Sequence, residues 1–310
     1  MKKKILIVKM GFTETIDRRI SVENVSLGDV FRTTAILHLF KKDQVSWLTT
    51  KEASPLLAGN PYIDRLLIYD LSTSLQLKSE QFDIIINLEK VPGVCALTDS
   101  INAWKRYGFR FDVKKGTAHA YEHSYEAVAN SEDPALRKKM KKNWAQMLYE
   151  MVGAKWSGQG YILAYKPKTS EKFDIGFNAR VGRRWPNKAW PEEHWKRLEK
   201  LISGRYSISY QQSLCDINGY IDWLNSCRLI ITNDSLGLHL AIALKKKAIA
   251  LFGPTSEKEV YMFDNGQIVR PSKKLKCIPC FSTRCKYNRS CMYMIKPETV
   301  YRKIEKTLQK

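Results

Sequence analysis

The sequence contains no run of about 18 or more apolar residues, the length that a helix needs to span a bilayer. Its basic start does not fit a secretory leader either. The apolar stretch that follows, Ile5–Val8, is far shorter than the roughly 7–15 residues that such a leader requires. We interpret Ile5–Val8 as a first buried strand and expect a cytoplasmic protein. An apolar content of 44% and an aromatic content of 11% exclude a disordered chain.

Acidic residues are also scarce. The chain has 31 Asp and Glu against 52 Lys and Arg, a formal charge of +21. Residues 156–310 hold 28 of the basic residues and 13 of the acidic ones, so they carry most of this excess. A positive surface attracts nucleoside diphosphates, phosphorylated lipids, acidic membranes or nucleic acid. The alternative is that the charge serves solubility alone.

Cysteine occurs seven times in 310 residues, and four of the seven fall close together near the C-terminus. These four are Cys277, Cys280, Cys285 and Cys291. A chain without a leader keeps its thiols reduced or uses them for a metal, so we do not expect a disulfide framework. Four thiolates suit tetrahedral zinc, and iron is the alternative. A metal held by four protein ligands has no open position, so we expect a structural site whose negative charge the neighbouring Lys and Arg residues offset.

Short apolar runs alternate with helical patterns along most of the chain. Strands are predicted at residues 45–49, 65–69, 82–88, 173–178, 229–232 and 248–252, and helical patterns at residues 29–40, 52–58, 119–152, 221–227 and 299–308. This alternation is typical of parallel, doubly wound sheets. Glycines and a proline mark a linker at residues 153–168, so we predict two domains, 1–160 and 161–310. We expect residues 104–111 to be part of a helix packed on the sheet, the alternative being an acceptor-binding surface.

The segment from Ile230 to Thr255 predicts a strand, a polar turn, a helix and a second strand that ends in Gly-Pro-Thr. Ligands bind at the carboxyl ends of the strands in open α/β sheets, and a helix N-terminus at that position suits a phosphate. The polar turn carries Asp234 and Ser235 as capping side chains, and Gly237 is expected to free the backbone there. The plainer alternative is a structural βαβ unit with His239 in its core.

Within this segment, Asn-Asp-Ser-x-Gly-x-His followed by Leu-Phe-Gly-Pro-Thr resembles the donor-site signature of glycosyltransferase family 9, the heptosyltransferase family. The resemblance implies that a sugar nucleotide is surrounded by four residues, which are Asp234, Ser235, Gly237 and His239. Many members place glycine two residues after the aspartate, where this chain has Leu236.

Two further segments resemble the same family. Lys188-Ala-Trp-Pro-Glu-Glu-His-Trp matches a loop and helix start from which Lys188 would reach the donor phosphates. Trp190 and Trp195 in it are expected to pack in the core. Asn178 ends the preceding strand and is expected at the donor site, whereas the ribose contact cannot be assigned.

Near the N-terminus, Gly-Asp-Val followed by a threonine-bearing helix resembles the family's first loop, in which the aspartate, here Asp29, is the catalytic base. A lone aspartate at a helix start more often serves the helix dipole alone. The polar stretch at residues 10–24 looks like an insertion before this motif.

Together these resemblances imply a GT-B fold, in which two Rossmann-like domains face a central cleft. Residues 1–160 would bind the acceptor and residues 161–310 the nucleotide sugar. The implied reaction is inverting transfer of a sugar, heptose in this family, from a donor such as ADP-heptose to a lipopolysaccharide or other cell-surface glycan. No Asp-x-Asp triplet occurs in the sequence, so we expect no catalytic metal.

Residues 137–142 form a basic run whose plainest role is a solvated face. Its functional alternative is peripheral contact with an anionic membrane, at the inner face of the inner membrane. Two rival functions remain: a sugar-nucleotide-binding module without transfer activity, and a basic nucleic-acid-binding protein. An intact Asp29 argues against the first, and the strand-rich halves argue against the second, so we expect no nucleic-acid partner.

Overall fold

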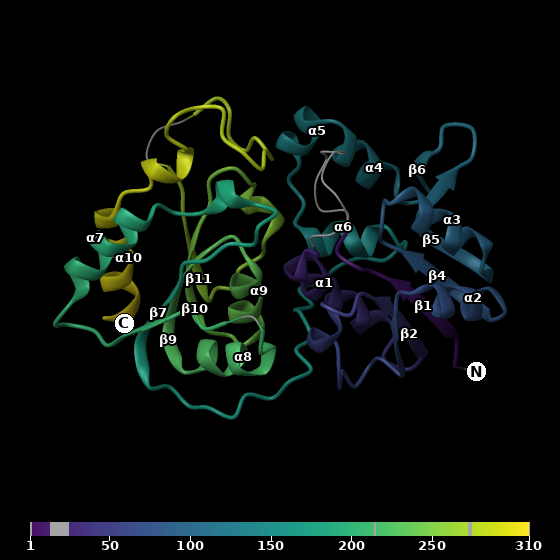
Figure 1. Cartoon of the computed structure of the whole chain (residues 1–310), viewed down its shortest axis with the longest axis horizontal. Coiled ribbons are helices and arrows are strands. Elements are labelled where there is room, and N and C mark those ends of the chain that lie inside the picture. The colour runs from purple at the N-terminus through teal and green to yellow at the C-terminus, as the bar shows by residue number, and fades with distance from the viewer. Residues whose placement is uncertain (1, 13–24, 214, 272–274, 310) are drawn as a thin grey trace. The chain divides into compact units, whose positions relative to one another are not determined.

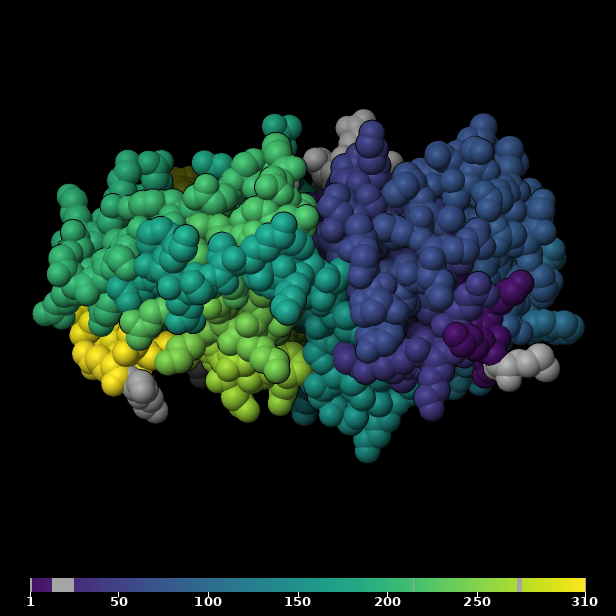
Figure 2. All heavy atoms as spheres, turned by 90° about the horizontal axis from the view of Figure 1, so that it is seen from below, coloured from purple at the N-terminus to yellow at the C-terminus, as the bar shows by residue number. Residues whose placement is uncertain are grey.

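A computed structural model describes residues 2–12, 25–213, 215–271 and 275–309. The chain divides into two compact units, Met1–Tyr165 and Lys166–Lys310. The sequence placed this division after residue 160. Figure 1 shows one sheet with its helices in each unit, and Figure 2 shows the same chain as a space-filling view. The insertion predicted at residues 10–24 lies largely outside the described residues.

Unit 1 is built on a six-stranded sheet with the strand order β3-β2-β1-β4-β5-β6. The strands are β1 (Lys4–Val8), β2 (Gln44–Thr49), β3 (Arg65–Ile68), β4 (Gln81–Asn87), β5 (Asn102–Asp112) and β6 (Thr117–Ala120). Neighbouring strands are parallel except for the β5–β6 pair. In the register, Val8 of β1 lies opposite Leu48 of β2 and Asn87 of β4. The carboxyl ends of these three strands therefore meet at one end of the sheet.

The central strand β1 is buried on both faces, which explains why its residues Ile5–Val8 are continuously apolar. The helical segments are α1 (Leu27–Thr33), η1 (Thr34–Leu39), η2 (Ser54–Leu56), α2 (Leu71–Lys78), α3 (Pro92–Ser100), α4 (Tyr125–Glu132), α5 (Pro134–Lys139) and α6 (Trp144–Glu150). Ile5 and Ile7 of β1 pack in one core with residues of α1, η1 and α6. Leu6 and Val8 pack in a second core with α2 and α3. Alternate side chains of one strand thus serve opposite layers.

The prediction of a helix at residues 104–111 is wrong, because this segment lies within strand β5. Its pairing with β4 provides the tertiary context that overrides the helical interpretation. Trp104 is 82% exposed, so it does not pack on the sheet.

The helical pattern at residues 119–152 is interrupted rather than continuous. Asp133 caps α5, which begins at Pro134, and Asn143 starts α6 with a capping box.

Unit 2 has a five-stranded, wholly parallel sheet with the order β11-β10-β9-β7-β8. Its strands are β7 (Phe173–Asn178), β8 (Ile208–Tyr210), β9 (Cys227–Asn233), β10 (Lys247–Leu251) and β11 (Gly266–Val269). Its helical segments are η3 (Pro186–Lys188), α7 (Glu192–Ile202), α8 (Ile217–Asn225), α9 (Leu236–Ala243), η4 (Glu257–Glu259), η5 (Cys291–Met294) and α10 (Pro297–Leu308). Helices α7 and α10 cover one face, where Trp190 and Trp195 are buried in the core as predicted. Helices α8 and α9 lie on the other face (Figure 1).

None of the helices within the described residues is long and apolar enough to cross a membrane.

Candidate functional site

Charged side chains gather where strands β1 and β4 end in unit 1. Lys9 follows β1, Glu89 follows β4 by two residues, and Asp29 lies in the first turn of α1. The Lys9 ammonium contacts the Asp29 carboxylate through Oδ2 and lies 3.2 Å from Glu89 Oε1. Arg32, one turn after Asp29, donates to Asp29 Oδ1 from Nε at 3.1 Å and from Nη2 at 2.8 Å. We call Lys9, Asp29, Arg32 and Glu89 the Asp29 cluster.

The Asp29 cluster is almost closed to solvent, and its charges stabilise one another. Asp29 is 3% exposed and Lys9 is 1% exposed. Burial alone would raise the pKa of the Asp29 carboxyl, but the positive charges of Lys9 and Arg32 outweigh burial and hold that pKa well below its usual range. Burial would likewise lower the pKa of Lys9, but Asp29 and Glu89 raise it instead. Asp29 is therefore ionised at neutral pH.

The backbone of the segment that follows β1 holds the Glu89 side chain in place. Its Oε1 accepts hydrogen bonds from the amides of Met10 and Gly11, each at 2.7 Å. Lys9, Arg32 and Glu89 are not among the site residues that the sequence motifs predicted. The sequence signal that could have identified Lys9 and Glu89 is their position after a strand, because a charged residue just after a buried parallel strand lies at the ligand-binding end of the sheet.

Lys90 lies beside this cluster and is partly buried. Its burial, followed by the nearby charges of Arg137 and Lys9, lowers the pKa of Lys90 to about 7. The ammonium also lies 5.6 Å from the centre of the Phe109 ring. Lys90 is therefore a group next to Asp29 that changes charge near neutral pH.

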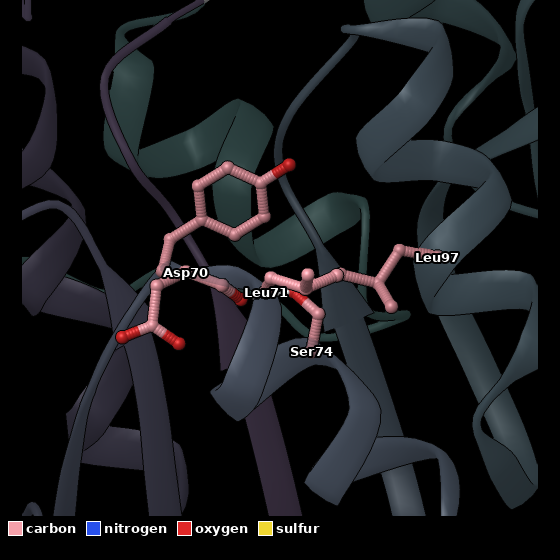
Figure 3. A pocket seen from close by; sticks show the side chains of 5 residues that line it. Asp70, Leu71, Ser74 and Leu97 are labelled. Carbon is pink, nitrogen blue, oxygen red and sulfur yellow. Dashed lines mark hydrogen bonds between the residues drawn. The ribbon is translucent and has the colours of Figure 1, made fainter.

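A cavity of about 310 Å³ opens near the carboxyl end of β3 in the same unit (Figure 3). It is lined by Tyr69, Asp70, Leu71, Ser74 and Leu97. Asp70 is already used as the N-cap of α2, where Oδ1 accepts from the Thr73 amide at 2.7 Å. Because the lining contains no Lys or Arg, the cavity is not suited to a phosphate group.

In unit 2 the corresponding end of the sheet carries a second buried ion pair. Lys188 Nζ lies 2.9 Å from Asp234 Oδ2, and the Thr255 hydroxyl donates to the same oxygen at 2.7 Å. Burial would raise the pKa of Asp234, but Lys188 and His239 first, and then these hydrogen bonds, lower it to about 2. We call Lys188, Asp234, Thr255 and His239 the Asp234 cluster. The structure thus brings together three residues predicted for the donor site and adds Thr255.

Asn178 and Ser235, both predicted to bind the donor, are joined to each other. Asn178 Nδ2 donates to the Thr232 hydroxyl at 2.7 Å and to Ser235 Oγ at 3.0 Å. Its Oδ1 accepts from the Tyr220 hydroxyl at 2.8 Å. Asn178 is fully buried, so its amide connects β7, α8, β9 and the start of α9 from within. Ser235 stands at the N-cap of α9, where its side chain makes no capping bond.

Gly237 has a different structural role from the one expected. It lies in α9, not in a free turn, and its φ is not in the left-handed region. A Cβ atom at this position would collide with Asn178 Nδ2 and would lie 2.5 Å from the Tyr220 hydroxyl. The glycine is therefore required because the buried Asn178 network approaches the helix backbone closely.

Asn233 fixes the loop that carries Lys188. Its Oδ1 accepts from the Trp190 amide at 3.1 Å, and its Nδ2 donates to the Ala179 carbonyl at 2.8 Å. The last residue of β9 thus holds the segment after Lys188, while Asp234 binds Lys188 itself. This local arrangement depends on two segments of the chain that the sequence could match to a family but could not place in contact.

The four predicted metal ligands lie in a segment, residues 275–291, that we call the cysteine loop. Burial is the main cause that raises the pKa of the Cys291 thiol to about 12. All four are free thiols. Across the described residues, no group of three or more His, Cys, Asp or Glu side chains has the arrangement of a metal site. The metal therefore stays a prediction.

Comparisons with known proteins support the resemblance seen in the sequence. The model of glycosyltransferase family 9 (heptosyltransferase) matches residues 214–290. Lipooligosaccharide heptosyltransferase 2 of Campylobacter jejuni is 36% identical over 81 residues, 26% of each chain. Lipopolysaccharide heptosyltransferase 2 of Escherichia coli is 25% identical over 182 residues, 49% of this chain and 51% of that protein. The aligned regions thus span between a quarter and about half of these relatives.

Solved structures match over the whole chain. The E. coli ADP-heptose lipopolysaccharide heptosyltransferase II structure has a TM-score of 0.67 at 14% identity and covers 100% of this chain and 99% of its own. An iron-containing dodecameric glycosyltransferase from enterotoxigenic E. coli has a TM-score of 0.58 at 11% identity, with 99% of this chain and 77% of that one covered. These matches confirm the predicted fold class, a GT-B glycosyltransferase fold with two Rossmann-like units.

Proposed function

We propose that the protein is an inverting heptosyltransferase that moves heptose from ADP-heptose to a lipopolysaccharide or related cell-surface glycan. The observation that carries the proposal is the Asp234 cluster. It lies at the carboxyl ends of β9 and β10, and most of it falls within the region that matches the family model. The names of the E. coli structure and of the curated relatives support the donor and the acceptor class.

On the donor side, Lys188 supplies a positive charge to the diphosphate. Asp234 holds the Lys188 ammonium 2.9 Å away, in a site with little access to water. The diphosphate gains negative charge as the bond to the anomeric carbon breaks, so a fixed cation stabilises the transition state more than the ground state. The N-terminus of α9 adds a favourable dipole at the same end of the sheet. No metal is required in this scheme.

On the acceptor side, Asp29 takes the proton of the attacking hydroxyl. Oδ1 already accepts two hydrogen bonds from Arg32, and Oδ2 contacts Lys9. A carboxylate has about four lone-pair sites, so within the described residues about one site on Oδ2 is left for the acceptor. A carboxylate with a lowered pKa is a weak base, but the hydroxyl becomes acidic as it bonds to the anomeric carbon. Proton transfer to Asp29 is therefore favourable late in the step.

The proposal is tested by measuring ADP binding by calorimetry and heptose transfer from ADP-heptose to a lipopolysaccharide acceptor. We expect Asp29→Asn to lose about 10²–10⁴-fold in transfer rate, the usual cost of removing a general base. Its affinity for ADP should be unchanged, because the base acts on the acceptor hydroxyl. The matched control is Asp70→Asn, which alters a carboxylate at the same end of the sheet and preserves the helix cap.

The outcomes separate the rival functions. ADP binding without transfer in the wild-type protein would favour a sugar-nucleotide-binding module. Absence of nucleoside diphosphate binding, together with tight and salt-dependent binding of nucleic acid, would contradict the proposal. Wild-type turnover by Asp29→Asn would exclude Asp29 as the base.

We also propose that the cysteine loop binds one structural metal ion, zinc or iron. The donor set is chemically suitable, because Cys277, Cys280, Cys285 and Cys291 are free thiols that fall close together in the sequence. The iron-containing relative supports iron as an alternative to zinc. When bound, the metal would stabilise the loop and leave the transfer chemistry to other residues.

Elemental analysis of gently purified protein should find one zinc or iron atom per chain. Cys280→Ser should lower the metal content and the melting temperature, whereas Cys215→Ser, an exposed thiol outside the loop, should change neither. Protein that contains no stoichiometric metal would contradict this part of the proposal.

Peripheral contact with an anionic membrane, and with it a cytoplasmic location at the inner membrane, completes the proposal. Lys139 and Lys141 are exposed near the end of α5, whereas Lys142 is occupied by ion pairs with Glu126 and Glu150 at 2.6 Å and 2.7 Å. Sedimentation with vesicles of phosphatidylglycerol should fall when both exposed lysines are changed to glutamine. Equal sedimentation of this variant and the wild type would exclude the contact.

A further inference from the structure

The cysteine loop is bound to both segments that carry the Asp234 cluster. On one side it meets η3, whose last residue is Lys188. The Asn187 amide donates to the Thr283 carbonyl at 3.3 Å, and Asn187 Nδ2 donates to the Ser282 carbonyl at 3.0 Å. Asn187 is 8% exposed, so these bonds are shielded from water. The residue next to Lys188 is therefore held by the cysteine loop.

On its other side the loop is bound to the turn after β10. The amides of Cys280 and Phe281 both donate to the Pro254 carbonyl, at 2.9 Å and 2.8 Å. Phe281 adopts a left-handed φ of 51° at this contact. Pro254 is followed by Thr255, whose hydroxyl binds Asp234. The close approach extends to the preceding residue, since a Cβ atom on Gly253 would lie 2.7 Å from Cys291 Sγ.

We propose that the cysteine loop is a wall of the nucleoside diphosphate site and that Asn187 is a positioning residue for Lys188. The loop spans from η3 to the Pro254 turn and so fixes the separation between Lys188 and Thr255, the two groups that contact Asp234 Oδ2. It also carries three exposed cations, which are Arg284, Lys286 and Arg289. This inference rests on the proposed function, because it assigns the loop to the donor site of that reaction.

The proposal is tested by calorimetry with ADP on the full chain. Asn187→Ala should weaken ADP binding by about 3- to 10-fold, the effect of one lost hydrogen bond. In the Lys188→Ala background the same change should have no further effect, because the residue that Asn187 positions is gone. The matched control is Asn225→Ala, which removes a similar hydrogen bond, from the Asn225 side-chain amide to the Thr169 carbonyl. Asn225 lies just before β9 begins, at the end of the sheet opposite the Asp234 cluster. Asn225→Ala should bind ADP as the wild type does.

Hydrogen exchange gives a readout that a merely structural role would not change. ADP should slow the exchange of the amides of residues 280–284 in the wild type, and this protection should be lost in Asn187→Ala. Wild-type ADP affinity in Asn187→Ala, or an equal loss with and without Lys188, would overturn the inference while leaving the proposed function intact. If the wild type binds no nucleoside diphosphate, the proposed function fails and this inference fails with it.

Discussion

The Asp29 cluster and the Asp234 cluster each place an ionised carboxylate near the carboxyl ends of parallel strands, one in each unit. They differ in how that charge is balanced. Asp29 contacts two cations, Lys9 and Arg32, and Glu89 also contacts Lys9, so two positive and two negative groups share a nearly dry site. Asp234 contacts one cation and one hydroxyl. This difference agrees with the proposed division of work, a carboxylate that receives a proton in unit 1 and a cation that meets a diphosphate in unit 2.

The largest expected effect comes from breaking the charge balance in unit 1. We expect Lys9→Met to lower the free energy of unfolding by about 3–5 kcal/mol, because removing one partner leaves two buried carboxylates without their shared cation. Chemical denaturation measures this change. Adding Glu89→Gln should recover part of the loss, since the second carboxylate is then neutral.

The matched control for this prediction is Lys196→Met. Lys196 lies 2.7 Å from Glu192 in a pair whose side chains are 69% and 81% exposed. Such a surface pair contributes little, so the variant should unfold as the wild type does. Equal stability of Lys9→Met and Lys196→Met would show that the Asp29 cluster is not a balanced charge network.

A smaller effect is expected from the packing beneath the Asp234 cluster. Gly237→Ala should lower the stability of unit 2 by about 1–3 kcal/mol, because the added methyl group overpacks the site where Asn178 and Tyr220 meet α9. It should also weaken ADP binding by disturbing the start of that helix. Gly182→Ala is the control, since a Cβ atom there meets nothing within 4 Å. Wild-type stability of Gly237→Ala would show that the helix can shift without cost.

A smaller effect than that of Gly237→Ala is expected on the acid side of the stability profile. The folded-state pKa of Asp234 is lowered to about 2, so the stability from this group is complete well above the usual carboxyl pKa of about 4 and is lost as the pH falls through that value toward 2. By pH 3.5 the loss should be about 0.7 kcal/mol relative to pH 7. Asp234→Asn should lack this part of the acid destabilisation. An identical pH dependence in wild type and variant would mean that the Lys188 pair does not lower this pKa.

Lys90 provides a test of opposite sign. A lysine with a pKa lowered to about 7 is neutral in the folded chain at a pH where it is charged in the unfolded chain. The unfolded state then binds more protons, so the contribution of Lys90 to stability rises as the pH increases from 7 toward 10. Melting temperatures of Lys90→Met should show a weaker rise over this range than those of the wild type. A parallel course of the two curves would show that Lys90 keeps its ordinary pKa.

The sequence by itself determined the α/β class and the strands at residues 5–8, 82–88, 173–178 and 229–232. It also determined the family resemblance around Asp29, Lys188 and Asp234. These features depend on local patterns, namely apolar runs bounded by polar turns and short motifs at fixed spacing. The tertiary structure decided that residues 104–111 form a strand, because pairing with β4 outweighs local preference. It also decided the partners of the predicted residues.

Lys9 meets Asp29 and Glu89 only because parallel strands bring their carboxyl ends together, and no local pattern contains that proximity. The role of Gly237 also depends on a distant segment. The sequence indicated a glycine for a flexible turn, whereas the fold requires a glycine in α9 because Asn178 of β7 occupies the space that a side chain would need. Residue types and spacings are local properties, but burial and contact between distant segments arise only when the chain is packed.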